Sequence, residues 1–210
     1  MLGPDTAGVF FLASVLLGLA PGPDNLYVLT QSAIHGHRAG LLVVLGLCTG
    51  LLVHTAAVAL GVAALFHTSA LAFNLLKWLG GAYLLYLAWQ AFRASSAAAP
   101  GRGRVPRLGP ARLYRRGVLM NVTNPKVSLF FLAFLPQFTD PALGSLVLQT
   151  VQLGGLFIVA TLLVFGGISL LAGTLGDWLG RSPRAMRMMN RATGVILALL
   201  ALRLLVEERS

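Results

Sequence analysis

The chain has 210 residues, of which 57% are hydrophobic and only 10% are charged, and its formal net charge is +10. Soluble domains carry about 25% charged residues, so this composition excludes an ordinary soluble domain. Several apolar runs reach the ~20 residues that cross the hydrocarbon core of a bilayer, which predicts an all-α integral membrane protein.

Six transmembrane helices are predicted, and they take up most of the chain. The first apolar stretch has the length of a signal-peptide core, but residues 1–5 contain no lysine or arginine, so we expect a retained first span. In chain order, the predicted spans cover residues 6–34, 40–66, 69–93, 117–138, 147–173 and 190–206.

The basic residues gather in the first, third and fifth connectors between these spans. By the positive-inside rule, these connectors are predicted to lie in the cytoplasm and both termini outside. Because this charge flanks membrane spans, we expect the lipid bilayer, and no nucleic acid, as its partner. The third connector, rich in Ala, Ser, Pro and Gly, is expected to lack regular structure up to Arg116. The three connectors hold twelve of the sixteen lysine and arginine residues: Arg38, Arg93, Arg102, Arg104, Arg107, Arg112, Arg115, Arg116, Arg181, Arg184, Arg187 and Arg191.

The chain is predicted to contain two inverted three-helix repeats. Residues 1–94 form the first repeat, residues 95–116 the basic cytoplasmic connector, and residues 117–210 the second repeat. An odd number of spans in each half places the second half upside down relative to the first, as in many secondary transporters.

Two helix-breaking motifs interrupt the first and fourth spans: Pro21-Gly22-Pro23-Asp24-Asn25 and Asn124-Pro125-Lys126. Proline lacks a backbone donor and clashes with the preceding turn, so helices 1 and 4 are expected to be broken. Broken helices at corresponding positions of two repeats are typical of a transporter binding site. We therefore expect both breaks to border one cavity near the middle of the membrane.

Each break is expected to start a new helix. Gly22 and Asn124 suit the N-cap position, and Pro23 and Pro125 suit the first helical position. The free N–H groups and positive dipole ends of the new helices are then expected to face the membrane interior.

The two motifs also carry the charges of the predicted site. Asp24 is the only acidic residue deep inside a predicted span, and ionisable groups in a membrane are functional candidates by default. Dipole complementarity in a first helical turn is its structural alternative. Lys126 opposes the dipole of its own helix, so local helix chemistry gives no reason for it. A substrate site or a mutual ion pair between Asp24 and Lys126 explains both residues.

Weaker signals allow structural and functional interpretations. Gly46 and Gly50 form a GxxxG pattern, and Gly80, Gly81, Gly166 and Gly167 also favour close helix packing. His54 is compatible with a proton relay and, more simply, with a hydrogen-bonded packing residue. Four further polar residues either line a polar path or bridge neighbouring helices, and the sequence leaves this open: Asn25, Gln31, Asn121 and Gln137.

These motifs resemble the signatures of the LysE/RhtB family of amino-acid exporters. The first signature is similar to Ala20-Pro21-Gly22-Pro23-Asp24-Asn25, followed by Gly36-His37-Arg38-Ala39-Gly40 and Lys77-Trp78-Leu79-Gly80-Gly81. The second is similar to Asn124-Pro125-Lys126, continued by Phe130-Phe131 and Leu135-Pro136-Gln137-Phe138. The final third of the chain matches only in general character. The resemblance implies an exporter of amino acids or close derivatives in the bacterial cytoplasmic membrane, driven by the proton gradient.

The sequence therefore predicts a secondary transporter and no enzyme or cofactor. We expect a neutral amino acid as the substrate, because the cavity candidates include few charged residues. Its carboxylate is expected to face Lys126 and the helix N-termini, and its ammonium group Asp24, which is also the proton-coupling candidate. The predicted substrate-binding residues are Pro21, Gly22, Pro23, Asp24, Asn25, Asn124, Pro125 and Lys126.

Three other functions are alternatives to export. A metal-cation exporter needs a ligand cluster, and Asp24, Cys48 and His54 make an unconvincing set. Thiol–disulfide transfer needs at least two thiols, and Cys48 is the single cysteine. A membrane hydrolase lacks a recognisable motif. The sequence leaves the amino acid, the coupling stoichiometry and the oligomeric state open.

Overall fold

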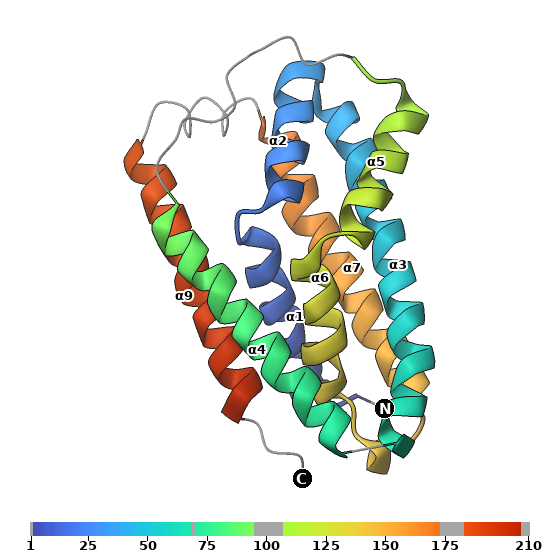
Figure 1. Cartoon of the computed structure of the whole chain (residues 1–210). Coiled ribbons are helices and arrows are strands. Elements are labelled where there is room, and N and C mark those ends of the chain that lie inside the picture. Colours follow the sequence, from blue (N-terminus) through green and yellow to red (C-terminus); the bar gives the residue numbers. More distant parts are fainter. Residues whose placement is uncertain (1, 69, 95–106, 173–182, 207–210) are drawn as a thin grey trace.

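The computed structural model describes residues 2–68, 70–94, 107–172 and 183–206, and every regular element in them is helical (Figure 1). The all-α class is thereby confirmed. The α-helices are α1 (Pro4–Leu19), α2 (Pro23–His35), α3 (His37–Thr68), α4 (Ala70–Arg93), α5 (Pro110–Val122), α6 (Pro125–Leu129), α7 (Leu146–Leu170) and α9 (Pro183–Val206). The π-helix η1 (Phe130–Phe134) and the 3₁₀ helix η2 (Leu135–Phe138) continue α6, and a 3₁₀ turn, η3 (Pro141–Leu143), follows.

Both predicted helix breaks are present. The axes of α1 and α2 differ by 63°, and those of α5 and the helix that starts at Pro125 differ by 48°. Counting each bent pair as one span gives up to five candidate membrane spans in the part of the chain that the structure describes. The three straight candidates are His37–Gly61, Leu146–Leu170 and Arg187–Val206. The predicted count of six spans is not confirmed.

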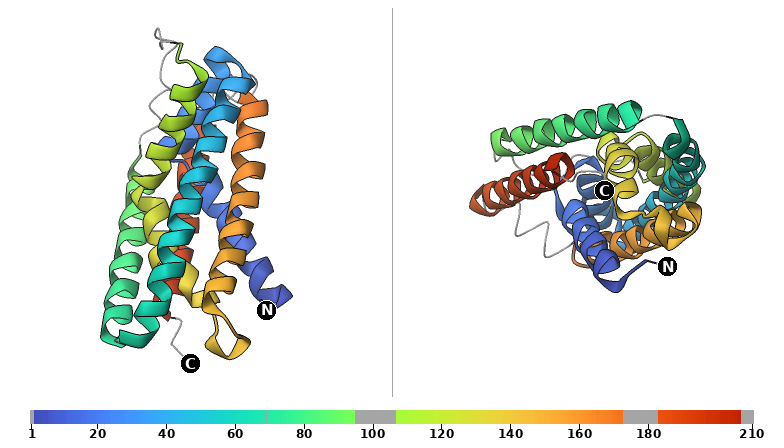
Figure 2. Two further views of the ribbon diagram at one scale, coloured as in Figure 1. Left: turned by 90° about the vertical axis from the view of Figure 1, so that its right-hand side faces the viewer. Right: turned by 90° about the horizontal axis from the view of Figure 1, so that it is seen from below.

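The helices pack around the central pair α3 and α7 (Figures 1 and 2). α3 packs against α5 and α7, and α1 packs against α7, so the two broken helices flank the α3–α7 pair. α4 and α9 pack against each other along one side of the molecule. A Cβ atom at Gly81 of α4 would lie 2.6 Å from the Leu205 side chain of α9, which confirms close helix packing at this glycine.

An aromatic cluster fixes the second half of the broken helix 4. The Phe130 ring lies 4.7 Å from that of Phe134 and 5.2 Å from that of Phe157 in α7, measured between centroids. Phe10 of α1 contacts Phe130 and Phe138 at 5.7 and 5.2 Å. Phe10, Phe130 and Phe134 are fully buried. This contact network holds the helix that begins at Pro125 against α1 and α7, and so positions the second break.

The expectation of irregular structure up to Arg116 is wrong for residues 110–116. Pro110 begins α5 after Gly109, whose extended backbone ends the loop. α5 continues because Leu113 and Gly117 are buried on one face, while Arg112, Arg115 and Arg116 lie on the exposed face. Similarly, α9 begins at Pro183 and includes three arginines assigned to the fifth connector. Residues 95–106 and 173–182 lie outside the described residues.

Candidate functional site

The two breaks restart their helices as the sequence predicts. Gly22 is the N-cap of α2, with an extended backbone (φ −161°, ψ 180°), and Pro23 is the first helical residue. Asn124 is the N-cap of α6, and its Oδ1 accepts a hydrogen bond from the Lys126 backbone N–H at 3.0 Å. Only the second break therefore has a side-chain cap.

Asn124 also connects the second break to the first. Its Nδ2 donates to Asp24 Oδ2 at 2.8 Å, between residues that are 4% and 3% exposed. The other carboxylate oxygen, Asp24 Oδ1, is buried without a hydrogen-bond partner within the described residues. The carboxylate thus retains one acceptor atom that the protein does not use.

Lys126 is bound to the end of α1 and not to Asp24. Its ammonium Nζ donates to the backbone oxygens of Leu17, at 3.2 Å, and Ala20, at 3.0 Å. Leu17 lies in the last turn of α1 and Ala20 is its C-cap, where backbone acceptors lack intrahelical partners and the dipole is negative. Among the described residues, Lys126 and Asp24 make no direct salt bridge, although the two charges attract each other at longer range. The hydrogen bonds of Lys126 therefore go to α1 and not to the carboxylate.

The sequence did contain a signal for this partner. Pro21 ends α1 at Leu19, and a terminated helix leaves carbonyl groups that need donors. In a membrane interior, water is not available to supply them. A cation that opposes the dipole of its own helix is thus favourable when it faces the C-terminus of another helix.

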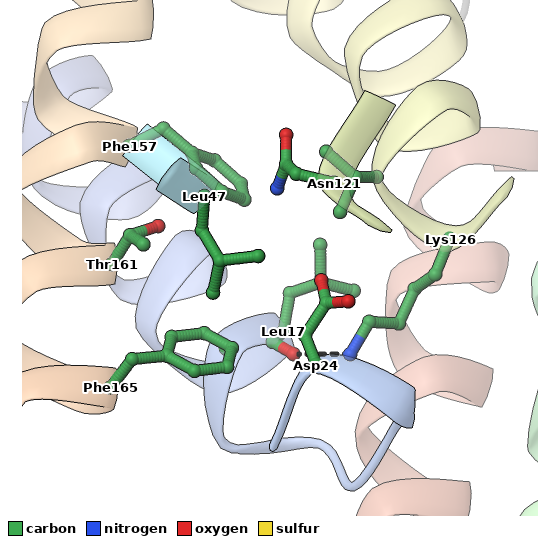
Figure 3. A pocket seen from close by; sticks show the side chains of 10 residues that line it. Leu17, Asp24, Leu47, Asn121, Lys126, Phe157, Thr161 and Phe165 are labelled. Atoms are coloured by element: carbon green, nitrogen blue, oxygen red, sulfur yellow. Dashed lines mark hydrogen bonds between the residues drawn. The ribbon is translucent and has the colours of Figure 1, made fainter. Parts of the chain in front are cut away.

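Both breaks border one small cavity, as expected (Figure 3). Its volume is about 20 Å³, which is room for about one water molecule. Two of the eight predicted site residues, Asp24 and Lys126, line it, together with residues of α1, α3, α5, α6 and α7. The complete lining is Leu17, Gly18, Asp24, Leu47, Asn121, Lys126, Val127, Phe157, Thr161 and Phe165.

The other predicted residues of the first break support this geometry from outside the cavity. Asn25 Nδ2 donates to the Gly18 carbonyl group at 2.7 Å and so bridges α2 to the end of α1. A Cβ atom at Gly22 would lie 3.2 Å from Lys126 Nζ, so the glycine gives the ammonium group room beside the break. Pro21 and Pro23 delimit the break between α1 and α2.

Asn121 lines the cavity, although its sequence context does not distinguish it from the other polar residues of the predicted spans. It lies in the last turn of α5, three residues before Asn124, and is 3% exposed. His54 lies behind it, with Nε2 3.2 Å from the Asn121 backbone oxygen and its ring 5.5 Å from that of Phe131. His54 therefore has the contacts of a hydrogen-bonded packing residue.

Gly46 and Gly50 serve close helix packing, whereas a Cβ atom at Gly166 or Gly167 would meet nothing within 4 Å, so close packing is not found at those two glycines. A Cβ atom at Gly46 would collide with the backbone of Tyr114 and Gly117, and one at Gly50 would lie 2.6 Å from Asn121 Oδ1. This contact brings α3 and α5 together beside the cavity. Within the described residues, no three His, Cys, Asp or Glu side chains come together as metal ligands.

Comparisons with known proteins agree with these features. The family model described as LysE type translocator matches residues 15–208. A homoserine/homoserine lactone efflux protein of Salmonella typhimurium is 36% identical over 90% of this chain and 91% of its own length. An uncharacterized membrane protein of Vibrio cholerae is 37% identical over 88% and 89%. A leucine efflux protein of Salmonella choleraesuis is 32% identical over 62% of each chain. No solved structure matches the chain.

Proposed function

Because the chain belongs to the LysE type translocator family, a family of membrane transporters, we propose that it exports a neutral amino acid by proton antiport. Export of amino acids agrees with the efflux proteins to which it is similar. The observation that carries the mechanism is the buried Asp24 carboxylate, which borders the cavity and has one unpartnered oxygen.

Asp24 is the proposed binding site for the substrate ammonium group. A buried carboxylate without a cation at salt-bridge distance is costly unless it is neutralised. The substrate ammonium group can neutralise it through Oδ1, and so can a proton, but both cannot occupy that oxygen together. Mutual exclusion at one atom couples the release of the amino acid to the uptake of a proton. It also favours a stoichiometry of one proton for one amino acid.

The chemistry of the cavity favours a substrate with a neutral side chain. Apolar side chains form much of its wall: Leu17, Leu47, Val127, Phe157 and Phe165. Lys126 is hydrogen-bonded to α1, so it is poorly placed to pair with an acidic side chain. A basic side chain would need a second carboxylate, and Asp24 is the acidic residue of the lining. Homoserine and leucine, named for the relatives, are therefore suitable first candidates.

Transport requires the cavity to open on each side in turn. A cavity of about 20 Å³ is far smaller than the ~300 Å³ and more that ligand pockets provide. We propose that the two inverted repeats, 1–94 and 117–210, rock against each other around the breaks. Each broken helix packs against the second helix of the other repeat, α1 against α7 and α5 against α3, which agrees with a symmetric relation between the repeats. In the proposed orientation, the basic connectors face the cytoplasm and both termini lie outside the cytoplasmic membrane.

The function is tested by efflux from proteoliposomes loaded with labelled L-homoserine or L-leucine. A pH gradient with the acidic solution outside the liposomes should accelerate efflux. Dissipating this gradient with a protonophore should remove the acceleration. The variant Asp24→Asn keeps the size of the side chain but cannot be ionised, so we expect the response to the gradient to disappear.

Asp140→Asn is the matched control for this substitution. Asp140 is an exposed residue of the turn before η3, and its Oδ1 accepts a hydrogen bond from the Ala142 backbone N–H. The side-chain oxygen of asparagine can accept the same hydrogen bond. Asp140→Asn should transport like the wild type. If efflux through Asp24→Asn responds to the pH gradient as efflux through the wild type does, Asp24 is not the proton site. Absence of efflux for every amino acid in a full panel would refute the proposed function itself.

A further inference from the structure

Asn121 has a side chain whose hydrogen-bonding capacity the protein does not use. The residue is 3% exposed, and its Oδ1 is buried without a partner. The hydrogen bond with His54 involves the backbone oxygen of Asn121, so the side-chain amide has no partner in the part of the chain that the structure describes. Figure 3 shows this amide beside Leu47 and Phe157 at the cavity wall. Its Oδ1 acceptor lies against Gly50 of α3, whereas its Nδ2 donor is on the side of Leu47 and Asp24 in Figure 3. Nδ2 is therefore the atom that an acceptor group of a ligand in the cavity can reach, and an unpaired buried amide favours such a partner.

Lys126 is a poor alternative for the same task. Two of its three N–H donors are directed to the carbonyl groups of Leu17 and Ala20, and its charge lies at the negative end of α1. Moving the ammonium group to a substrate carboxylate would leave those carbonyl groups without donors in an apolar environment. Of the other polar residues that line the cavity, Asn121 and Thr161, Asn121 is the one with a buried side-chain atom that has no hydrogen-bond partner among the described residues.

We infer that Asn121 binds the carbonyl oxygen at the carboxyl end of the substrate, while Asp24 holds the ammonium group. This inference rests on the proposed export function and assigns a specificity residue within it. A neutral amide donates a hydrogen bond to the carbonyl oxygen of a carboxylate, a lactone or an amide alike. The substrate class is then a primary ammonium compound with a carbonyl group on the adjacent carbon, and a negative charge on that carbonyl group is not required.

The inference is tested by competition for exchange of labelled L-homoserine in proteoliposomes. The competitors are L-homoserine, L-homoserine lactone and N-acetyl-L-homoserine, and the readout is the concentration that halves the initial rate. For the wild type, we expect the acid and the lactone to compete within about fivefold of each other, the range spanned by single neutral hydrogen bonds. N-acetyl-L-homoserine lacks the ammonium group and should not compete.

Asn121→Leu preserves approximate size and removes the hydrogen bond. It should raise the half-inhibitory concentrations of the acid and the lactone together by about fivefold to tenfold. Asn190→Leu is the matched control, because Asn190 is equally a buried asparagine but lies in α9, with Nδ2 3.4 Å from the Ala94 backbone oxygen. It should leave both concentrations unchanged. Lys126→Met should leave their ratio unchanged.

Two results would overturn the assignment while leaving the proposed function intact. The first is that the wild type prefers the acid over the lactone by more than about tenfold and that Lys126→Met abolishes this preference. Such a result is expected if the Lys126 ammonium group recognises the charge of the carboxylate. The second is that the acid and the lactone have the same half-inhibitory concentrations in Asn121→Leu as in the wild type. If no amino acid exchanges at all, the proposed function fails and the role of Asn121 fails with it.

Discussion

Lys126 illustrates how a residue that is unfavourable in its own helix can be favourable in the fold. In the first turn of α6 its charge opposes the helix dipole. The ammonium group, however, reaches the last carbonyl groups of α1, where a positive charge is stabilising. Asn124 uses its oxygen to cap α6 and its nitrogen to bind Asp24. At the scale of single residues, side chains of the second break thus complete the first: Lys126 binds the end of α1, and Asn124 binds Asp24.

This geometry predicts how substitutions at Asp24 and Lys126 combine. Lys126→Met removes two charge-assisted hydrogen bonds and should lower the free energy of unfolding by about 2–3 kcal/mol. Since Lys126 is hydrogen-bonded to α1 and not to the carboxylate, Asp24→Asn should recover only a minor part of this loss, through the longer-range attraction between the two charges. The double variant should then lose nearly the sum of the two single losses, measured by thermal unfolding in detergent.

A direct ion pair predicts a different result for the same double variant. Neutralising both members of such a pair recovers much of the stability that each single change removes. Recovery of more than half of the Lys126→Met loss in the double variant would therefore contradict the assignment of Lys126 to the end of α1. Asp140→Asn combined with Lys126→Met provides the control for unrelated charge effects.

At the scale of elements, the half-helices form the cavity because they end there. α1 stops at Leu19, α2 starts at Pro23, α5 stops at Val122 and α6 starts at Pro125. Each end presents backbone groups that a continuous helix would use internally. The π-helix η1, which follows α6 directly, carries the buried phenylalanines that anchor this end against α1 and α7. The aromatic cluster and the break are parts of one continuous segment.

Converting the first break into a continuous helix should abolish transport more than insertion. Replacing Pro21, Gly22 and Pro23 together with alanine favours helix through the break, by up to about 3 kcal/mol for a proline in a helix interior. The carbonyl groups that bind Lys126 would then be used within the helix. We expect near-normal membrane levels and loss of amino-acid efflux, measured by immunoblot and proteoliposome transport.

Pro110→Ala is the control for this change, since Pro110 is also the first residue of a helix but begins α5 at its basic end. It should keep both membrane level and transport. Efflux at the wild-type rate from the triple alanine variant would show that the break between α1 and α2 is not needed for transport.

At the scale of the whole molecule, the basic residues set the expected orientation. Connectors one, three and five carry most of the positive charge, and the bundle has its three described basic segments at one end (Figure 1). These segments are the α2–α3 turn at Gly36, the start of α5 and the start of α9. Their common location agrees with one cytoplasmic face under the positive-inside rule.

Reporter fusions test this orientation directly. Alkaline phosphatase, which folds to an active form only outside the cytoplasm, should be inactive after Ser96 and active after Ser210. A cytoplasmic fluorescent reporter should give the reverse pattern at the same two positions. Phosphatase activity after Ser96 but not after Ser210 would invert the proposed topology, whereas the same compartment for both fusions would contradict the inverted repeat.

Local sequence is enough to predict the helical class, the two breaks, their caps and the presence of Asp24 and Lys126 beside the cavity. These features follow from local chemistry, because proline ends a helix and a buried charge is costly in any membrane protein. The partners depend on the tertiary structure: Lys126 binds α1 more than a hundred residues earlier, and Asn121 reaches the cavity. Sequence patterns indicate that a buried polar group needs a partner, but only the packing of distant helices determines which group it meets.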